Sequence, residues 1–118
     1  MMMETNVIEQ KSFLFAVRIV KLYKMLSSQH NEYVLSKQLL RSGTSIGANV
    51  SEAQNAQSRA DFLSKMNIAL KETTETKYWL RLLYATEYLP AVVFQSIFDD
   101  CVEIEKILVS IVRTTKNI

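Results

Sequence analysis

Apolar and small residues recur every three or four positions through four segments of this chain, which predicts four α-helices. We expect the helices to cover about residues 6–27, 34–54, 59–88 and 90–114. The inward-facing positions of the first two are Ile8, Ser12, Phe15, Ile19, Leu22 and Leu26, then Leu35, Leu39, Ser42, Ile46, Asn49 or Val50, and Ala53. Those of the last two are Phe62, Met66, Ala69, Thr73, Thr76, Leu80 and Leu83, then Val93, Ile97, Ile104, Leu108 and Ile111.

Local signals mark the start of the last two helices. Ser58 precedes Asp61 by three residues, so its hydroxyl can accept a hydrogen bond from the amide at position 61. Pro90 suits the first turn of a helix, where its missing N–H would have no partner. Long helices joined by short connections favour an all-α fold, an antiparallel up-down-up-down four-helix bundle that fills one domain over residues 1–118.

Composition agrees with this fold class and also bears on disulfides, membrane insertion and cellular location. The chain is 48% hydrophobic and has only two glycines and one proline, which disfavours a turn-rich β-fold. The single cysteine, Cys101, cannot form an internal disulfide, and we expect it in the core. Residues 1–8 lack the pattern of a signal peptide and no apolar run is long enough to span a bilayer, so we expect a cytoplasmic protein without a membrane partner.

Three of the predicted helices are apolar on more than one face. Residues beside the main stripes include Phe13, Val17 and Val20 in the first helix, Ile68, Trp79 and Leu82 in the third, and Phe98, Val102 and Val109 in the fourth. A helix that is apolar on several faces is usually covered by several neighbours. We therefore expect a homo-oligomer, and the alternative is a thick monomeric core with some exposed apolar residues.

Both glycines fall on one face of the second predicted helix. Gly43 and Gly47 are four residues apart, and glycine within a helix costs about 1 kcal/mol relative to alanine. Small residues at this spacing allow a neighbouring helix to come close. The segment lacks the phosphate-binding GxxxxGK[ST] pattern and follows no strand, so we interpret the glycines as packing residues.

The same segment resembles a known family. QLLRSGTSIGANVSEA (residues 38–53), with SRADFLSKMNIALKETTETKYWLRLL (58–83) and FLFAVRIVKLYKML (13–26), is similar to the bacterial four-helix-bundle, ribosomal protein-like products of 23S ribosomal RNA intervening sequences. Relatives of that family include the accessory variability protein of diversity-generating retroelements. The motif residues are Arg41, Ser42, Gly43, Ser45, Ile46, Gly47, Asn49 and Glu52.

The resemblance implies a closed homopentamer without catalytic activity, whose basic surface binds nucleic acid or a nucleic-acid-processing protein. One segment departs from the better-known branch of the family. That branch carries Ala-x-Gly-Ser before a glutamate in its third helix, whereas here Ala69 is followed by Leu-Lys-Glu72. The chain therefore resembles a different branch.

Carboxylates raise the alternative of a metal site in the bundle. Glu72 and Glu75 lie one helical turn apart and Glu52 ends the second helix. A di-iron bundle needs two Glu-x-x-His pairs, and the single histidine, His30, falls in a predicted loop. We therefore expect no metal and no other cofactor. The cations able to pair with the carboxylates are Lys71, Arg81 and Arg41.

Nucleophilic catalysis has little support in the sequence. Ser45 or Cys101 would need a neighbouring base, and His30 is the only imidazole. The polar residues Arg41, Ser45 and Asn49 recur every four positions. They could contact a phosphate or a partner chain, but we favour a polar network between the second and third helices. We expect a protein that is not an enzyme.

Basic residues form the candidate binding surface. They cluster on the first and third predicted helices as Arg18, Lys21 and Lys24, with Lys11 nearby, and as Lys71, Lys77 and Arg81. The net charge of +2 is mild, but copies around a ring would multiply the phosphate contacts. We therefore expect binding of RNA or DNA, as an accessory to a nucleic-acid enzyme. The alternative is a protein-interaction scaffold whose charges only solvate its surface.

Overall fold

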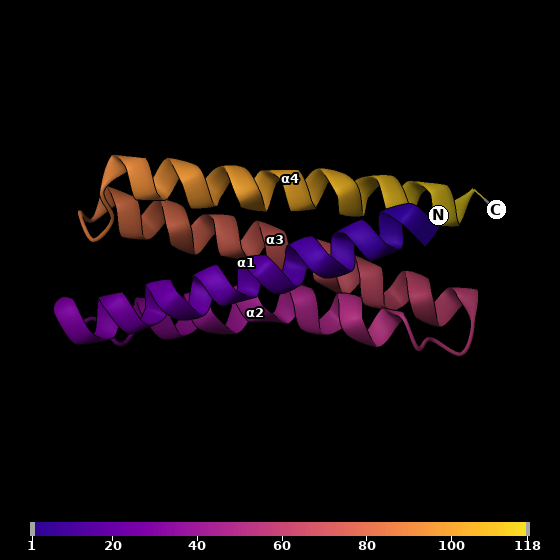
Figure 1. Ribbon diagram of the computed structural model, residues 1–118, viewed down its shortest axis with the longest axis horizontal. Helices are drawn as coiled ribbons and strands as arrows, with labels where there is room; N and C mark the ends of the chain where they lie inside the picture. Colours follow the sequence, from indigo (N-terminus) through magenta and orange to yellow (C-terminus); the bar gives the residue numbers. More distant parts are fainter. Residues whose placement is uncertain (1, 118) are drawn as a thin grey trace.

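The computed structural model describes residues 2–117, and their side chains from Asn6 onward. Four helices account for most of this part of the chain: α1 (Met2–Gln29), α2 (Leu35–Ala53), α3 (Arg59–Ala85) and α4 (Ala91–Lys116). They pack side by side along one long axis (Figure 1). The described residues contain no strand, so the predicted all-α four-helix bundle is confirmed.

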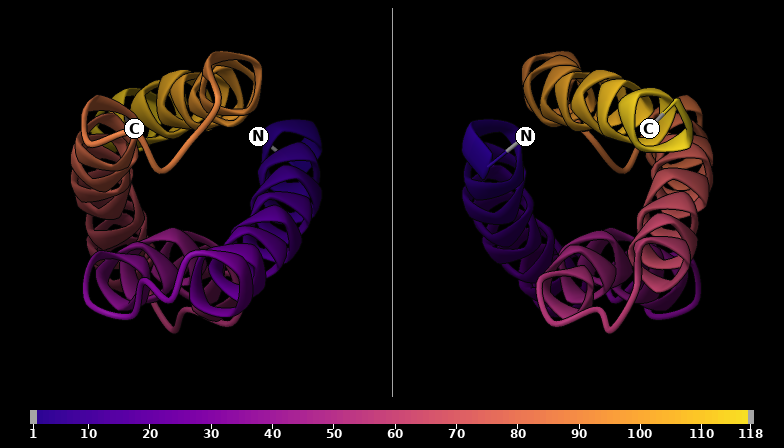
Figure 2. Two further views of the ribbon diagram at one scale, coloured as in Figure 1. Left: turned by 90° about the vertical axis from the view of Figure 1, so that its left-hand side faces the viewer. Right: turned by 90° about the vertical axis from the view of Figure 1, so that its right-hand side faces the viewer.

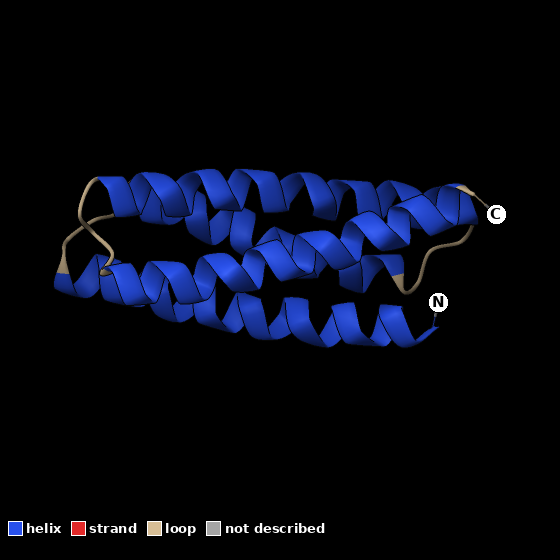
Figure 3. Cartoon of the chain, turned by 90° about the horizontal axis from the view of Figure 1, so that it is seen from above, coloured by secondary structure: helices blue, strands red, loops and turns tan. Residues whose placement is uncertain are grey.

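The helices are arranged in a cycle. Helix α2 packs against α1 and α3, and α4 packs against α3 and α1, while the backbones of α1 and α3 lie diagonally across the core from one another (Figure 2). The α1–α2 and α3–α4 loops lie at one end of the bundle, and the α2–α3 loop lies at the other (Figures 1 and 3). The bundle measures 46 × 21 × 19 Å. None of the helices in the described range has an apolar stretch long enough to cross a bilayer.

The predicted inward-facing stripes form the core. Every stripe residue of α1 is buried, and so are Leu39, Ile46 and Val50 of α2. Helices α3 and α4 face them with buried residues that include Met66, Leu80, Ile104 and Leu108. The stripe positions that are only partly buried are Leu35, Asn49, Phe62 and Val93. Cys101 lies in the core, as predicted.

The helix ends follow the predicted signals in part. The amide of Asp61 donates to the Ser58 hydroxyl at 3.0 Å, which confirms the cap of α3. Pro90 takes extended backbone angles and immediately precedes α4. The prediction that the third helix continues to residue 88 is wrong, because Glu87 adopts a left-handed φ of 69° that cannot continue a helix.

The carboxylate of Glu32, which the helical spacing does not single out, caps the first turn of α2. The amides of Val34 and Leu35 donate to one oxygen of Glu32 at 3.1 and 3.0 Å, and the amide of Ser36 donates to the other at 2.7 Å. Burial disfavours the charged form of this carboxyl, but the hydrogen bonds from Leu35, Ser36 and Val34 outweigh burial and lower its pKa. Glu32 thus satisfies amides that would otherwise have no partner at the first turn.

The glycines lie where α1 comes closest to α2. A Cβ atom on Gly43 would lie 2.8 Å from Cγ1 of Ile19, a buried side chain of α1. A Cβ atom on Gly47 would lie 3.1 Å from the backbone carbonyl oxygen of Ser12. Both glycines therefore allow a close approach of two helices, and the neighbour that approaches is α1 of the same chain.

Candidate nucleic-acid interface

The predicted basic residues of α1 divide into two groups. Arg18 forms an ion pair with Asp100 of α4 and donates to the Ser96 hydroxyl at 3.2 Å. Lys21 and Lys24 are exposed on the side of α1 opposite its buried stripe, and neither forms an ion pair with another described residue. Arg18 therefore stabilises the packing of α1 on α4, whereas the two lysines face solvent.

The basic residues of α3 divide in the same way. The Nζ of Lys77 lies 2.9 Å from Oε1 of Glu105 in α4, and both side chains are about three-quarters buried. Lys71 and Arg81 are exposed, and the described part of the chain offers them no ion pair. Of the six predicted binding residues, Lys21, Lys24, Lys71 and Arg81 are thus available to a ligand without breaking an internal pair.

The fold separates the two sets of exposed cations. Because α1 and α3 occupy opposite corners of the bundle, Lys21 and Lys24 lie on a different face from Lys71 and Arg81 (Figure 2). The structure places the members of each pair on one side of the same helix, but it does not bring the two pairs together. One copy of the chain therefore presents two small basic surfaces.

The motif residues of α2 form hydrogen bonds and ion pairs mainly with other residues of the same chain. Arg41 forms ion pairs with Glu75 and, at 3.5 Å, with Glu72 of α3, so Arg41 is the partner among the three cations considered for these carboxylates. Its hydrogen bond lowers the pKa of the Glu75 carboxyl and raises that of the guanidinium. The Ser45 hydroxyl donates to the Arg41 carbonyl at 2.6 Å, and the Asn49 amide donates to the Ser45 carbonyl at 2.8 Å.

The polar network proposed for this motif is therefore only partly present. Arg41 connects α2 to α3, whereas Ser45 and Asn49 bond to the backbone of their own helix. Ser42 is buried at the same seam, 3.0 Å from the Thr76 hydroxyl of α3. Glu52, at the far end of the motif, lies 3.8 Å from Lys65.

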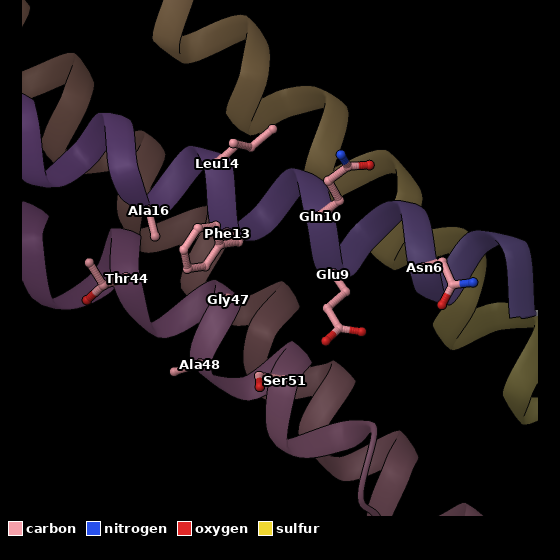
Figure 4. A pocket seen from close by; sticks show the side chains of 10 residues that line it. All are labelled: Asn6, Glu9, Gln10, Phe13, Leu14, Ala16, Thr44, Gly47, Ala48 and Ser51. Atoms are coloured by element: carbon pink, nitrogen blue, oxygen red, sulfur yellow. The ribbon is translucent and has the colours of Figure 1, made fainter.

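A groove runs between the N-terminal half of α1 and the C-terminal half of α2. Its volume is about 730 Å³, and its wall on the α2 side is formed by small residues such as Gly47, Ala48 and Ser51. Figure 4 shows the Phe13 ring projecting from α1 toward α2 over this groove. Phe13 is 67% exposed and Leu14 is 55% exposed, so this apolar surface is not covered by the rest of the chain.

Cys101 and His30, two of the three side chains considered for catalysis, lie in different surroundings. Burial raises the pKa of the Cys101 thiol to about 12, and its sulfur lies 3.6 Å from the Thr73 carbonyl oxygen. His30 is exposed in the α1–α2 loop, with its ring edge-on to Tyr88. The thiol is therefore protonated at neutral pH and inaccessible to a substrate.

Comparisons with known proteins agree with this fold. The 23S rRNA-intervening sequence protein family matches residues 4–110. A crystal structure of a protein of unknown function from the S23 ribosomal protein family of Bacteroides thetaiotaomicron VPI-5482 is similar, with a TM-score of 0.92 and 58% identity over 93% of this chain and 98% of that one. No curated protein matches the chain. The chain belongs to the 23S rRNA-intervening sequence protein family.

Proposed function

We propose that this protein is a non-catalytic homopentamer of antiparallel four-helix bundles that binds RNA or DNA through its exposed basic residues, in the cytoplasm, as an accessory to a nucleic-acid-processing protein. The observation that carries the binding proposal is that four of the six predicted binding residues are exposed and form no ion pair with another described residue: Lys21, Lys24, Lys71 and Arg81. Such cations are free to neutralise phosphates and release their counterions.

The ion pairs elsewhere in the bundle support this assignment. Arg18 and Lys77 each face an acidic residue of α4, so binding a phosphate there would require loss of an existing partner. The exposed cations need no such exchange. Arg18 and Lys77 then contribute to the field around the bundle rather than to direct phosphate contacts.

Two unlike apolar surfaces support assembly into a ring. One lies on α1, where Phe13 and Leu14 are exposed; the other lies where α3 meets α4, where Val92 is 81% exposed and Tyr84 stacks on Phe94 with ring centroids 4.4 Å apart. Apolar surfaces of this kind usually contact another molecule. Two different surfaces favour head-to-tail contacts, which form a ring when the rotation between successive copies closes. The placement of the loops supports helices that alternate in direction.

Binding is tested by fluorescence anisotropy with a labelled transcript from 23S ribosomal RNA, titrated at several salt concentrations. We expect the logarithm of the affinity to fall linearly with the logarithm of the salt concentration. The paired variants Lys21→Gln with Lys24→Gln, and Lys71→Gln with Arg81→Gln, should each lower that slope by about 1 to 2.

The control is Lys106→Gln, which removes a charge from an exposed lysine on α4. It should leave the slope nearly unchanged. Absence of binding at 50 mM salt, or equal slopes in all variants, would contradict nucleic-acid binding by these residues. Light scattering checks the assembly separately, because a mass of one chain would refute the pentamer.

A second candidate, a protein-interaction scaffold, is favoured by the groove between α1 and α2. Its exposed Phe13 could hold an apolar segment of another protein against the small residues of α2. Replacing Phe13 by serine would then abolish capture of a protein partner and leave RNA binding unchanged. The same change would lower RNA binding only if the groove also holds the ring together.

A further inference from the structure

The outer face of α3 combines two cations with an exposed aromatic side chain. Lys71, Thr74, Tyr78 and Arg81 follow one another at spacings of three, four and three residues, so they fall within about 80° around the helix. All four are exposed, and the Tyr78 side chain is 54% exposed. An aromatic ring thus lies between two cations on a surface that no other helix of the chain covers.

No acidic residue of α3 falls within this arc of about 80°, although Glu75 follows Lys71 by one helical turn. The acidic residues nearest to it on α3, Glu72 and Glu75, point toward α2, where Arg41 pairs with both. Lys77 turns the other way, toward Glu105 of α4. Neither Lys71 nor Arg81 forms an ion pair within α3, so the face is complementary to a polyanion.

The ring of Tyr78 contacts the ring of Trp79, the next residue of α3. It packs edge-on with Trp79, with ring centroids 5.1 Å apart and planes at 76°. Trp79 is itself held by a hydrogen bond from its Nε1 to Oε1 of Glu75, at 3.3 Å. A ring with a fixed neighbour loses little conformational freedom when a second planar group stacks on it.

The spacing along the helix fits a ligand that offers both phosphates and planar groups. At about 1.5 Å per residue, Tyr78 lies about 10 Å from Lys71 and about 4.5 Å from Arg81 along the axis. Single strands are held by this combination of cations along the backbone and aromatic rings under the bases. A duplex exposes its phosphates, but its bases are stacked on one another and cannot reach the ring.

We infer that the outer face of α3 binds a single-stranded segment of nucleic acid, with a base stacked on Tyr78 and phosphates held by Lys71 and Arg81. This inference rests on the proposed nucleic-acid binding and assigns the strand to one helix. The α1 surface lacks the same combination, because Lys21 and Lys24 neighbour Val17 and Val20, and Phe13 leans over the α2 groove (Figure 4).

The test compares a labelled 20-nucleotide single-stranded RNA with the duplex formed by annealing its complement. Tyr78→Ala should weaken binding of the single strand about 5- to 100-fold, the loss typical of one stacked base, and change duplex binding less than twofold. Tyr78→Phe keeps the ring and should bind within twofold of the wild type. Trp79, the only tryptophan, should change its emission when the single strand binds.

Controls separate stacking from folding and assembly. Tyr33→Ala removes another exposed tyrosine, from the α1–α2 loop, and should leave both affinities unchanged. If Lys71→Gln with Arg81→Gln weakens both ligands but Tyr78→Ala affects neither, the stacking inference is overturned and the basic surface stands. Failure of the wild type to bind either ligand at 50 mM salt would overturn both proposals. A changed mass of Tyr78→Ala in light scattering would place Tyr78 between copies and overturn the inference.

Discussion

Replacing Glu32 should destabilise the bundle at neutral pH, because its carboxylate accepts hydrogen bonds from three amides at the start of α2. Loss of a capping side chain costs about 0.5–2 kcal/mol. Loss of a negative charge at a helix N-terminus adds about 0.3–1 kcal/mol. Since Glu32 is only 8% exposed, water replaces it poorly, and we expect Glu32→Ala to lower the free energy of unfolding by roughly 2 kcal/mol.

The dependence on pH separates the charge from the shape of the side chain. Glu32→Gln keeps an acceptor oxygen but loses the charge, so we expect a loss of about 1 kcal/mol at pH 7. The pKa of Glu32 is lowered in the folded protein. Its stabilisation is therefore complete above the ordinary glutamate pKa of about 4.3 and is lost as the pH falls through the lower, folded value. The gap between wild type and Glu32→Gln should narrow from pH 5 to pH 3.

Urea unfolding followed by circular dichroism, at fixed protein concentration and at pH 7, 5 and 3, measures these differences. Glu87→Gln is the matched control, because it removes the same charge from an exposed residue after α3 and should change stability by less than about 0.5 kcal/mol. A Glu32→Ala variant as stable as the wild type at pH 7 would refute the capping role. A gap that stays constant down to pH 3 would refute the role of the charge.

Three further predictions concern the seams between helices. Gly43→Ala should lower stability by about 1 kcal/mol, since overpacking against Ile19 exceeds the gain in helix propensity, and a double-mutant cycle with Ile19→Ala should reveal the coupling. Cys101 should not react with a thiol reagent at pH 8 until the protein unfolds, so rapid reaction of the folded protein would contradict its burial and its pKa of about 12. Arg41→Gln should cost less than about 1 kcal/mol in urea unfolding, and an undiminished loss in 1 M salt would argue against an ionic origin.

The sequence predicts the core well because burial repeats with the period of the helix. In α1 the stripe from Ile8 to Leu26 is read directly from spacing, and each of its residues is buried. The glycines were also interpretable, since close approach is the main use of glycine within a helix. What spacing cannot supply is the identity of the neighbour, which the structure assigns to α1.

The ion pairs and caps could not be predicted from the sequence, because each depends on which side chain or backbone group lies opposite in the fold. A helical wheel places Arg18 beside Lys21, but Asp100, which pairs with Arg18, lies 82 residues away in α4. Glu32 lies between the first two predicted helices, and spacing does not predict its capping role, because that role depends on the turn at Asn31, whose φ is 52°. A glutamate just before a helix start was the available signal.

If the protein binds nucleic acid as proposed, the diagonal placement of α1 and α3 limits the length of strand that one copy can contact. The cross-section of the bundle is 21 × 19 Å, so a strand lying along one helix cannot meet the cations of the other without bending around the bundle. In an assembly, the shortest path between a Lys24 and an Arg81 can instead run from one copy to the next. The length of RNA needed for tight binding would then depend on the number of subunits that the strand must reach. Shorter fragments would bind with the affinity of a single copy.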